Sequence, residues 1–425
     1  MMILVPFLLF SCKKDEDQNG PSIEIIFPNN GASFMVPTEV PVRVRVSDDR
    51  EVTTVRFDLY NSDGIPVTNG RTATVEAPSA EVERSLDLTD ERLLSGAITL
   101  AVRASDGVQE TTEHRSLQLQ AAPLRLRALY ATGVSGGQTI ITRFDSLLAP
   151  SIWSTVAQDH SGAVISSNSG TLAIAGNVTG DLIGLNTSDA TAQWTLNNPG
   201  TGQLPFFLWA GTTDQGRLLI STGDAFVRSM NFATGAQSYA RGTLPGHLAG
   251  ALEQVGTYLI SDQWEIAGPM RRLVIYSFAT GDLLTSYALD IEVVGFWALD
   301  EDRVLVFGNR NGDLVIAERN VELGGGWEPI DLSNSVLRDV VRTGPQSFVL
   351  ATDQGTFRYT YPNNSLVPLD GSPSMVLAYH AASGAVFSAA GNTIRILDPI
   401  LGSTLGTLNT SHPITSLCPL FNRDP

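Results

Sequence analysis

A repeat of about 42 residues extends from residue 124 to the end of the chain, and it constrains the fold more than any other feature. Each copy contains two short apolar runs joined by a turn, and the second run usually ends in an aromatic residue or leucine. The seven copies contain Thr142-Arg143-Phe144, Ile183-Gly184-Leu185, Met230-Asn231-Phe232, Tyr276-Ser277-Phe278, Val315-Ile316-Ala317, Tyr359-Thr360-Tyr361 and Arg395-Ile396-Leu397. This period is typical of four-stranded blades. We therefore expect residues 124–422 to form a seven-bladed β-propeller.

A second aromatic position keeps the same phase as the repeat. Phe144 precedes Trp153, Leu185 precedes Trp194, Phe278 precedes Tyr287 and Glu318 precedes Trp327 at one spacing, and Phe232 precedes Tyr239 slightly sooner. The first copy, Arg125 to Val156, supplies only three strands, whereas residues 413–421 supply one. We expect these three strands and one strand to combine into a single blade, because closure of the ring removes exposed sheet edges. Cys418 would then be a small buried residue on an inner strand.

The turns of the repeat carry a family resemblance. Phe232-Ala233-Thr234-Gly235 and Phe278-Ala279-Thr280-Gly281 are nearly identical, and Gly180 to Leu185 leads to Trp194 in the same way. These segments resemble the repeats of quinoprotein-like and WD40-like propellers over about 290 residues. The resemblance implies the architecture only. The Gly-His and Trp-Asp pairs of true WD40 blades are absent, and no block matches pyrroloquinoline quinone ligands.

Residues 22–121 show a different pattern, with short runs of alternating apolar residues bounded by Asp, Asn, Gly or Pro. The alternating residues are Ile23 and Ile25; Val42, Val44 and Val46; Val55, Phe57 and Leu59; Leu86 and Leu88; Ile98, Leu100 and Val102; Leu117 and Leu119. About seven short strands in this length predict a two-sheet sandwich. The opening Pro21 to Gly31 and the segment Ala104 to Gly107 resemble immunoglobulin-like modules of Bacteroidetes surface proteins. The whole chain is thus predicted to be all-β: an immunoglobulin-like β-sandwich, then a propeller closed by a C-terminal strand.

Several carboxylates of the first domain could be calcium ligands or ordinary turn residues. They are Asp48, Asp49, Asp87, Asp90 and Asp106. Their spacing fits no loop with alternating ligands and a turn glycine. We therefore expect them to be strand-end and turn residues.

The beginning of the chain predicts where the protein works. Residues 1–11 are apolar and uncharged, and they are too short to span a bilayer. Leu9-Phe10-Ser11-Cys12 resembles the cleavage box of bacterial lipoproteins, which implies lipid on Cys12 and a tether over residues 12–21. The run Lys13, Lys14, Asp15, Glu16 and Asp17 resembles the export signal of surface lipoproteins in the Bacteroidetes. The alternative is a short leader with an incidental cysteine. The resemblance implies an outer-membrane anchor and, from the export run, exposure at the cell surface.

Composition excludes some functions and gives no support to others. Acidic residues outnumber basic ones by 44 to 27, which disfavours a nucleic-acid partner. Removal of the leader and lipidation of Cys12 leave Cys418 as the one free thiol, so we expect no intramolecular disulfide. The five histidines, His114, His160, His247, His380 and His412, have no metal-ligand spacing, and no nucleophile elbow is present. We therefore predict no catalytic residue, no metal and no cofactor.

One irregular segment is the best candidate for binding. In the fourth blade, Ser261 to Met270 separates two strands that elsewhere need only a short turn. It places Trp264 beside Arg271 and Arg272, and the next blade has Asn309 and Arg310 at the equivalent turn. Tryptophan next to arginine is typical of an interface hot spot or a sugar-stacking platform. The alternative is a loop whose tryptophan folds back onto the blade.

The sequence is compatible with three functions. The first is a non-enzymatic envelope lipoprotein whose propeller binds a protein or a glycan. The second is a propeller enzyme, such as a hydrolase, a lyase or a quinoprotein-type dehydrogenase, with acids or histidines near the central channel. The third is a periplasm-facing lipoprotein that assists outer-membrane assembly. A fold alone does not choose among them.

Overall fold

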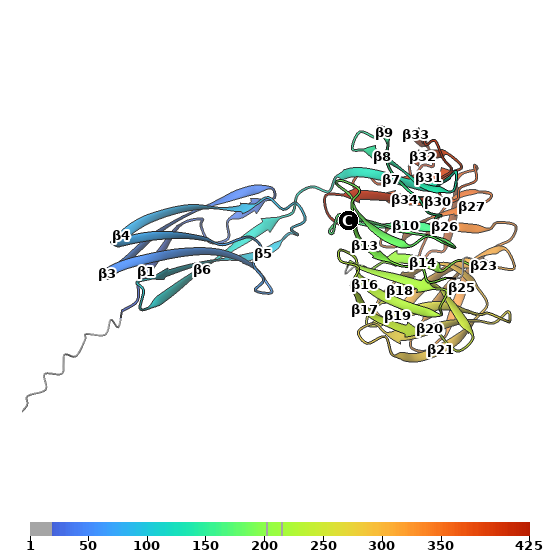
Figure 1. Cartoon of the computed structure of the whole chain (residues 1–425), viewed down its shortest axis with the longest axis horizontal. Helices are drawn as coiled ribbons and strands as arrows, with labels where there is room; N and C mark the ends of the chain where they lie inside the picture. Colours follow the sequence, from blue (N-terminus) through green and yellow to red (C-terminus); the bar gives the residue numbers. More distant parts are fainter. Residues whose placement is uncertain (1–18, 201–202, 214–215) are drawn as a thin grey trace, which may run out of the picture. The chain divides into compact units, whose positions relative to one another are not determined.

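The computed structural model describes residues 19–200, 203–213 and 216–425, and the chain divides into two units between Pro123 and Leu124. Every regular element in these residues is a β-strand (Figure 1). The predicted all-β class is therefore confirmed. Each unit has its own hydrophobic core and is described separately.

The first unit is a six-stranded sheet folded around one core. Its strands are β1 (Ser22–Phe27), β2 (Ser33–Met35), β3 (Thr38–Asn61), β4 (Arg71–Leu88), β5 (Gly96–Ser105) and β6 (Glu110–Gln120). They pair in the order β1-β3-β5-β6-β2, with β4 also on β3. The first half of β3 pairs with β1 and the second half with β5, while β4 pairs with both halves. Figure 1 shows β3 and β4 as the two long blue ribbons of this unit.

The alternating residues form the core as predicted, but the strand count differs. Val42, Val44 and Val46 and then Val55, Phe57 and Leu59 are fully buried. They belong to one strand, β3, rather than to two short ones. The segment between them contains no glycine or proline, so the chain continues through irregular pairing near Val52 instead of turning. The prediction of seven short strands was wrong for this reason.

The second unit consists of seven four-stranded sheets, which we call blades 1 to 7. Blade 1 contains β34 (Ser416–Phe421), β7 (Leu126–Ser135), β8 (Gln138–Asp145) and β9 (Pro150–Val156). Blades 2 to 4 contain β10 (Gly162–Ser166), β11 (Thr171–Ala175), β12 (Leu182–Asn186) and β13 (Ala192–Leu196); β14 (Phe207–Thr212), β15 (Arg217–Thr222), β16 (Phe226–Asn231) and β17 (Gln237–Gly242); β18 (His247–Val255), β19 (Tyr258–Glu265), β20 (Arg271–Ser277) and β21 (Leu283–Leu289). Blades 5 to 7 contain β22 (Glu292–Ala298), β23 (Arg303–Arg310), β24 (Asp313–Asn320) and β25 (Gly326–Leu332); β26 (Leu337–Gly344), β27 (Ser347–Thr352), β28 (Gly355–Thr360) and β29 (Ser365–Asp370); β30 (Val376–His380), β31 (Ala385–Ala390), β32 (Thr393–Leu397) and β33 (Thr404–Asn409).

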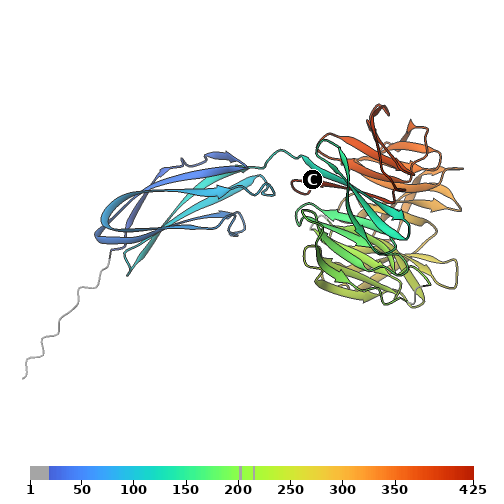
Figure 2. The same ribbon diagram turned by 45° about the horizontal axis from the view of Figure 1, so that its top comes forward.

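The first strand of each blade lies innermost, and these strands contact one another in a closed ring. Strand β34 lies between β30 and β10 in this ring and pairs antiparallel with β7. Figures 1 and 2 show the dark red β34 beside the teal β7. The seven-bladed propeller closed by three strands plus one is therefore confirmed. Cys418 is 3% exposed on β34, and burial raises the pKa of its thiol to about 12.

The repeated aromatic residues occupy the fourth strands and fix their packing. Trp194 on β13 pairs with Gly184 on β12, where an added Cβ would lie 2.2 Å from the indole Cε2 atom. Glycine at this position therefore makes room for the ring. The indole Nε1 of Trp194 donates to the carbonyl of Phe232 in the next blade at 2.9 Å. The regular spacing of these aromatic residues along the chain thus reflects contacts between neighbouring blades.

Two buried histidines lie where the ring closes. His160, between blades 1 and 2, places Nε2 2.8 Å from the hydroxyl of Thr132 and Nδ1 3.2 Å from the carbonyl of Ala175. His412, between β33 and β34, places Nε2 3.1 Å from the hydroxyl of Thr142. Burial lowers the pKa of His160 to about 4. Both side chains thus join the first blade to its neighbours through hydrogen bonds.

Candidate functional site

The predicted binding residues lie at one end of blade 4. Because the four strands of each blade alternate in direction, the connections between second and third strands share one face of the propeller with the connections between blades. We call this the 2–3 face and the opposite one the 1–2 face. Trp264 is the penultimate residue of β19 and pairs with Arg271, the first residue of β20. The segment read from sequence as a long loop is shorter than expected, because Ser261 to Glu265 extend β19 and only residues 266–270 turn.

Trp264 packs back onto its own blade. The Arg271 guanidinium lies over its ring, 5.4 Å from the ring centroid. A Cβ added to Gly250 would lie 3.0 Å from Trp264 Cζ3, so the indole also rests against the backbone of β18. Trp264 stays partly exposed, and these contacts cover part of its ring.

A buried carboxylate holds Arg271 in this position. Arg271 donates to Asp262 Oδ2 at 2.7 Å, and the Asp262 side chain is 2% exposed. Burial raises the pKa of Asp262 to about 7, whereas the neighbouring Arg271 opposes the shift. The guanidinium is also 3.8 Å from Glu292 Oε1 in blade 5. Trp264, Arg271 and Asp262 therefore form one stack that joins blades 4 and 5.

The structure does not bring the other predicted residues into this stack. Arg272 donates to the hydroxyl of Ser286 at 3.1 Å on β21. Asn309 is 9% exposed, and its amide exchanges hydrogen bonds of 3.0 and 2.8 Å with the backbone of Leu337 in blade 6. Arg310 bonds Glu328 at 2.8 Å, which raises the pKa of its guanidinium. These three side chains are thus engaged within the propeller.

The exposed residues of the hairpin are ones that the sequence analysis did not single out. Ile266 is 63% exposed and Met270 is 56% exposed at the turn between β19 and β20. We call these two side chains the hairpin tip. The backbone holds the tip in place, because Ile266 donates to Gly246 and Glu265 donates to Met270, both at 2.9 Å. Apolar residues in a turn are the sequence signal that could have indicated it.

Other apolar side chains are exposed on the same face. Leu204 lies between blades 2 and 3, Phe226 begins β16, and Met375 precedes blade 7. Arg228 lies 5.0 Å from the Phe226 ring. These residues belong to different blades, whereas Ile266 and Met270 share a single turn.

A second candidate site is the central channel. A cavity of about 650 Å³ is lined by residues from the innermost strands of all seven blades. Its lining includes Trp209 on β14, Trp297 on β22, Tyr379 on β30 and Asp339 on β26. These residues lie far apart in sequence, so no local pattern could have grouped them.

The channel does not fit pyrroloquinoline quinone, the cofactor that quinoprotein chemistry would require. That cofactor carries several carboxylates. Arg342 is the arginine of the lining, and it donates instead to the backbone carbonyls of Gly344, Ala298 and Pro345. The carboxylates of Glu253, Asp339 and Asp424 line the same cavity and would repel the cofactor.

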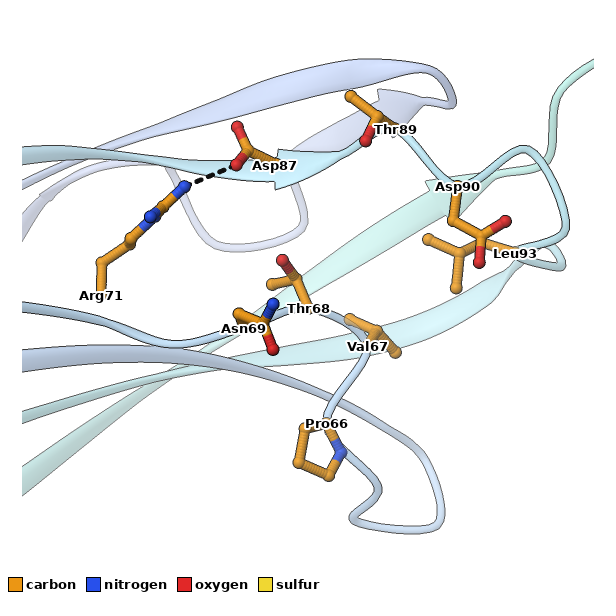
Figure 3. A pocket seen from close by; sticks show the side chains of 9 residues that line it. All are labelled: Pro66, Val67, Thr68, Asn69, Arg71, Asp87, Thr89, Asp90 and Leu93. Carbon is orange, nitrogen blue, oxygen red and sulfur yellow. Dashed lines mark hydrogen bonds and ion pairs between the residues drawn. The ribbon is translucent and has the colours of Figure 1, made fainter.

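The first unit has a smaller hollow, of about 490 Å³ (Figure 3). Figure 3 shows Arg71 paired with Asp87, at 2.6 Å, on one side and Asp90 beside Leu93 on the other. Asp48, Asp90 and Asp106 accept backbone N–H groups of their own turns, as expected of turn carboxylates. Within residues 19–200, 203–213 and 216–425, no three His, Cys, Asp or Glu residues are placed to hold a metal ion.

The lipid-attachment residue Cys12 and the export run Lys13, Lys14, Asp15, Glu16 and Asp17 lie outside the described residues. In the part of the chain that the structure describes, no helix is long and apolar enough to cross a membrane.

Comparison with known proteins supports both folds. Residues 21–85 match the family described as a bacterial Ig domain. The first unit is therefore an immunoglobulin-like domain. No curated protein is similar enough in sequence to count as a relative of this chain.

The whole chain is similar in structure to a quinoprotein alcohol dehydrogenase-like protein from Bacteroides thetaiotaomicron. The TM-score is 0.50 at 10% identity, over 95% of this chain and 99% of that one. Raptor from Chaetomium thermophilum gives a TM-score of 0.49 at 12% identity, over 61% of this chain and 26% of that one. The computationally designed Ika8 protein gives 0.47 at 14% identity, over 69% of this chain and 90% of that one. At these identities the first likeness shows a shared fold and carries no activity over.

Proposed function

We propose that this chain is a non-enzymatic binding protein of the bacterial cell envelope, and that its propeller binds a protein partner on the 2–3 face. The observation that carries the proposal is the hairpin tip. Ile266 and Met270 are both more than half exposed there, on a turn held by backbone hydrogen bonds. Exposed Ile and Met side chains beside a Trp-Arg stack have the composition of a protein interface. A glycan partner is less well supported, because Arg271 and the backbone of Gly250 already occupy part of the Trp264 ring.

The location belongs to the same proposal. The apolar residues 1–11, Cys12 and the Lys-Lys-acidic run support a lipid anchor in the outer membrane of a member of the Bacteroidetes, with the propeller displayed at the cell surface. The immunoglobulin-like unit would then act as a spacer between the anchor and the propeller.

Site-specific crosslinking in cells of the source organism tests the binding face. A photoreactive residue at position 266 should give a discrete adduct with one protein, and the double substitution Ile266→Asp and Met270→Asp should abolish binding of that purified protein. The control is the same photoreactive residue at Leu401, which is 77% exposed on a turn of the 1–2 face. Equal adducts at both positions, or none at position 266, would contradict the proposal.

Two further measurements test the location. Labelled palmitate should enter the protein and should fail to enter after Cys12→Ala. Protease treatment of intact cells should cleave a surface-displayed propeller. Protection from protease would favour the periplasm-facing assembly role instead.

A further inference from the structure

Aromatic and acidic side chains line the central channel, and the proposed partner site does not use them. Trp209, Trp297 and Tyr379 line the cavity from blades 3, 5 and 7, and each is partly exposed. A glycine beside Trp209 makes room for its ring. A Cβ on Gly211 would lie 2.1 Å from Trp209 Cη2, so the indole lies across the backbone of β14.

Among these lining residues, the carboxylate of Asp339 has no cationic partner. Its strand, β26, lies between β22, which carries Trp297, and β30, which carries Tyr379. Asp339 Oδ1 accepts from Val340 at 2.8 Å and Oδ2 accepts from Leu377 at 2.7 Å. Among the described residues, no cationic side chain forms an ion pair with Asp339, because Arg342 is turned to backbone carbonyls.

The environment of Asp339 favours a ligand that brings a positive charge. Although part of the side chain is exposed to the cavity, the packing around it raises the pKa of the carboxyl to about 6. The group is therefore ionised at pH 7.5 but poorly solvated, and a bound cation would replace the missing counter-charge. Aromatic faces attract the same kind of ligand through cation–π interaction.

We propose that the central channel binds a small organic cation, with its charged group at Asp339 and its apolar part against Trp209, Trp297 and Tyr379. A cavity of about 650 Å³ is within the range of small-molecule sites. The proposal is independent of the hairpin tip, because neither Ile266 nor Met270 lines this cavity.

Calorimetric titration of the whole protein with paired probes tests the proposal. The cations are choline and benzyltrimethylammonium, and the controls are their neutral carbon isosteres, 3,3-dimethylbutan-1-ol and neopentylbenzene. We expect each cation to bind roughly tenfold more tightly than its isostere. Asp339→Asn should remove this preference, and Trp209→Leu should weaken the binding of both cations about fivefold. Asp282→Asn, at a carboxylate that is 67% exposed on an outer turn, should change nothing.

The outcomes separate clearly. Equal affinity for cation and isostere in the unmodified protein, or no binding of either cation, would overturn the proposal. This comparison does not depend on whether the Asp339→Asn variant folds. Thermal unfolding of each variant shows whether a lost affinity reflects a lost site. Unchanged cation preference in a folded Asp339→Asn variant would also overturn the assigned role.

Discussion

The buried histidine at the ring closure makes the propeller sensitive to acid, and the effect can be calculated. His160 is 7% exposed, and its pKa is lowered from 6.5 to about 4, mainly by burial. The unfolded chain therefore takes up a proton near pH 6.5, whereas the folded chain takes it up only near pH 4. Between these values the unfolded state binds more protons, so the free energy of unfolding falls as the pH falls.

The size of the effect follows from the two pKa values. One pKa unit corresponds to about 1.4 kcal/mol, so His160 should reduce the free energy of unfolding by roughly 2 kcal/mol at pH 5 and roughly 3 kcal/mol at pH 4, relative to pH 8. Asp262 and Asp339 act in the opposite direction. Burial raises their pKa values to about 7 and about 6, so the folded state protonates first and gains stability as the pH falls. Only a difference between two proteins isolates the contribution of the histidine.

The assay is urea unfolding of the unmodified protein and of His160→Gln from pH 8 to pH 4.5. Glutamine can still bond Thr132 and Ala175 but does not titrate. Intrinsic tryptophan fluorescence reports on the propeller alone, because all six tryptophans lie in it. The unmodified protein should lose roughly 2 kcal/mol more than His160→Gln between pH 8 and pH 5. His114→Gln, at an exposed residue of the first unit, should behave like the unmodified protein.

Parallel stability curves for the unmodified protein and His160→Gln would refute this reasoning. They would mean that the imidazole already carries a proton in the folded state at pH 5, or that water reaches it. The hydrogen bonds to Thr132 and Ala175 would then be made by a protonated imidazole instead of a neutral one.

Three other perturbations have direct outcomes. Gly184→Ala should lower the free energy of unfolding by about 2 kcal/mol, since the new methyl group overlaps the indole packed on it, whereas Gly242→Ala, with open space around it, should be close to neutral in urea unfolding. Arg271→Met should destabilise the propeller by about 3 kcal/mol at pH 8, because it leaves the Asp262 carboxylate buried without its partner. Adding Asp262→Asn should recover much of that loss. If the losses of the two single variants simply add in the double variant, the stack is contradicted. Cys418 should resist iodoacetamide at pH 8 in the folded protein and react once urea unfolds it, as read by peptide mass spectrometry; rapid labelling of the native protein would mean that β34 opens readily.

The sequence predicts the architecture because the features that define blades are local. Trp194 must have a small partner on the adjacent strand, and Gly184 provides it within the same repeat. The pairing of the first and last strands was also predictable, since an incomplete first repeat leaves only one position for the final strand. The continuous strand β3 was missed, because irregular pairing near Val52 replaces a turn without any glycine or proline to mark it.

The candidate sites were less predictable, for a physical reason. The exposure of Trp264 depends on Gly250, whose bare backbone accepts the indole, and on Arg271, which Asp262 holds over the ring. Composition shows the tryptophan and the arginine but not this packing. The channel site is even harder to predict from sequence. The surroundings of Asp339 come from three strands of different blades, and these strands meet only in the closed ring.

The closed first blade also determines how the propeller bears mechanical load. The segment that leaves the immunoglobulin-like unit continues into β7, which is the second strand of its blade and is hydrogen-bonded along both edges, to β34 and to β8. A pull on this segment acts on a strand held by two hydrogen-bond ladders rather than on an edge strand. If a bound partner exerts force on the propeller while the N-terminal end of the chain is held at a membrane, the force reaches the propeller at this doubly paired strand. Resistance to flow or to a moving partner would then be a property of strand order, without any disulfide.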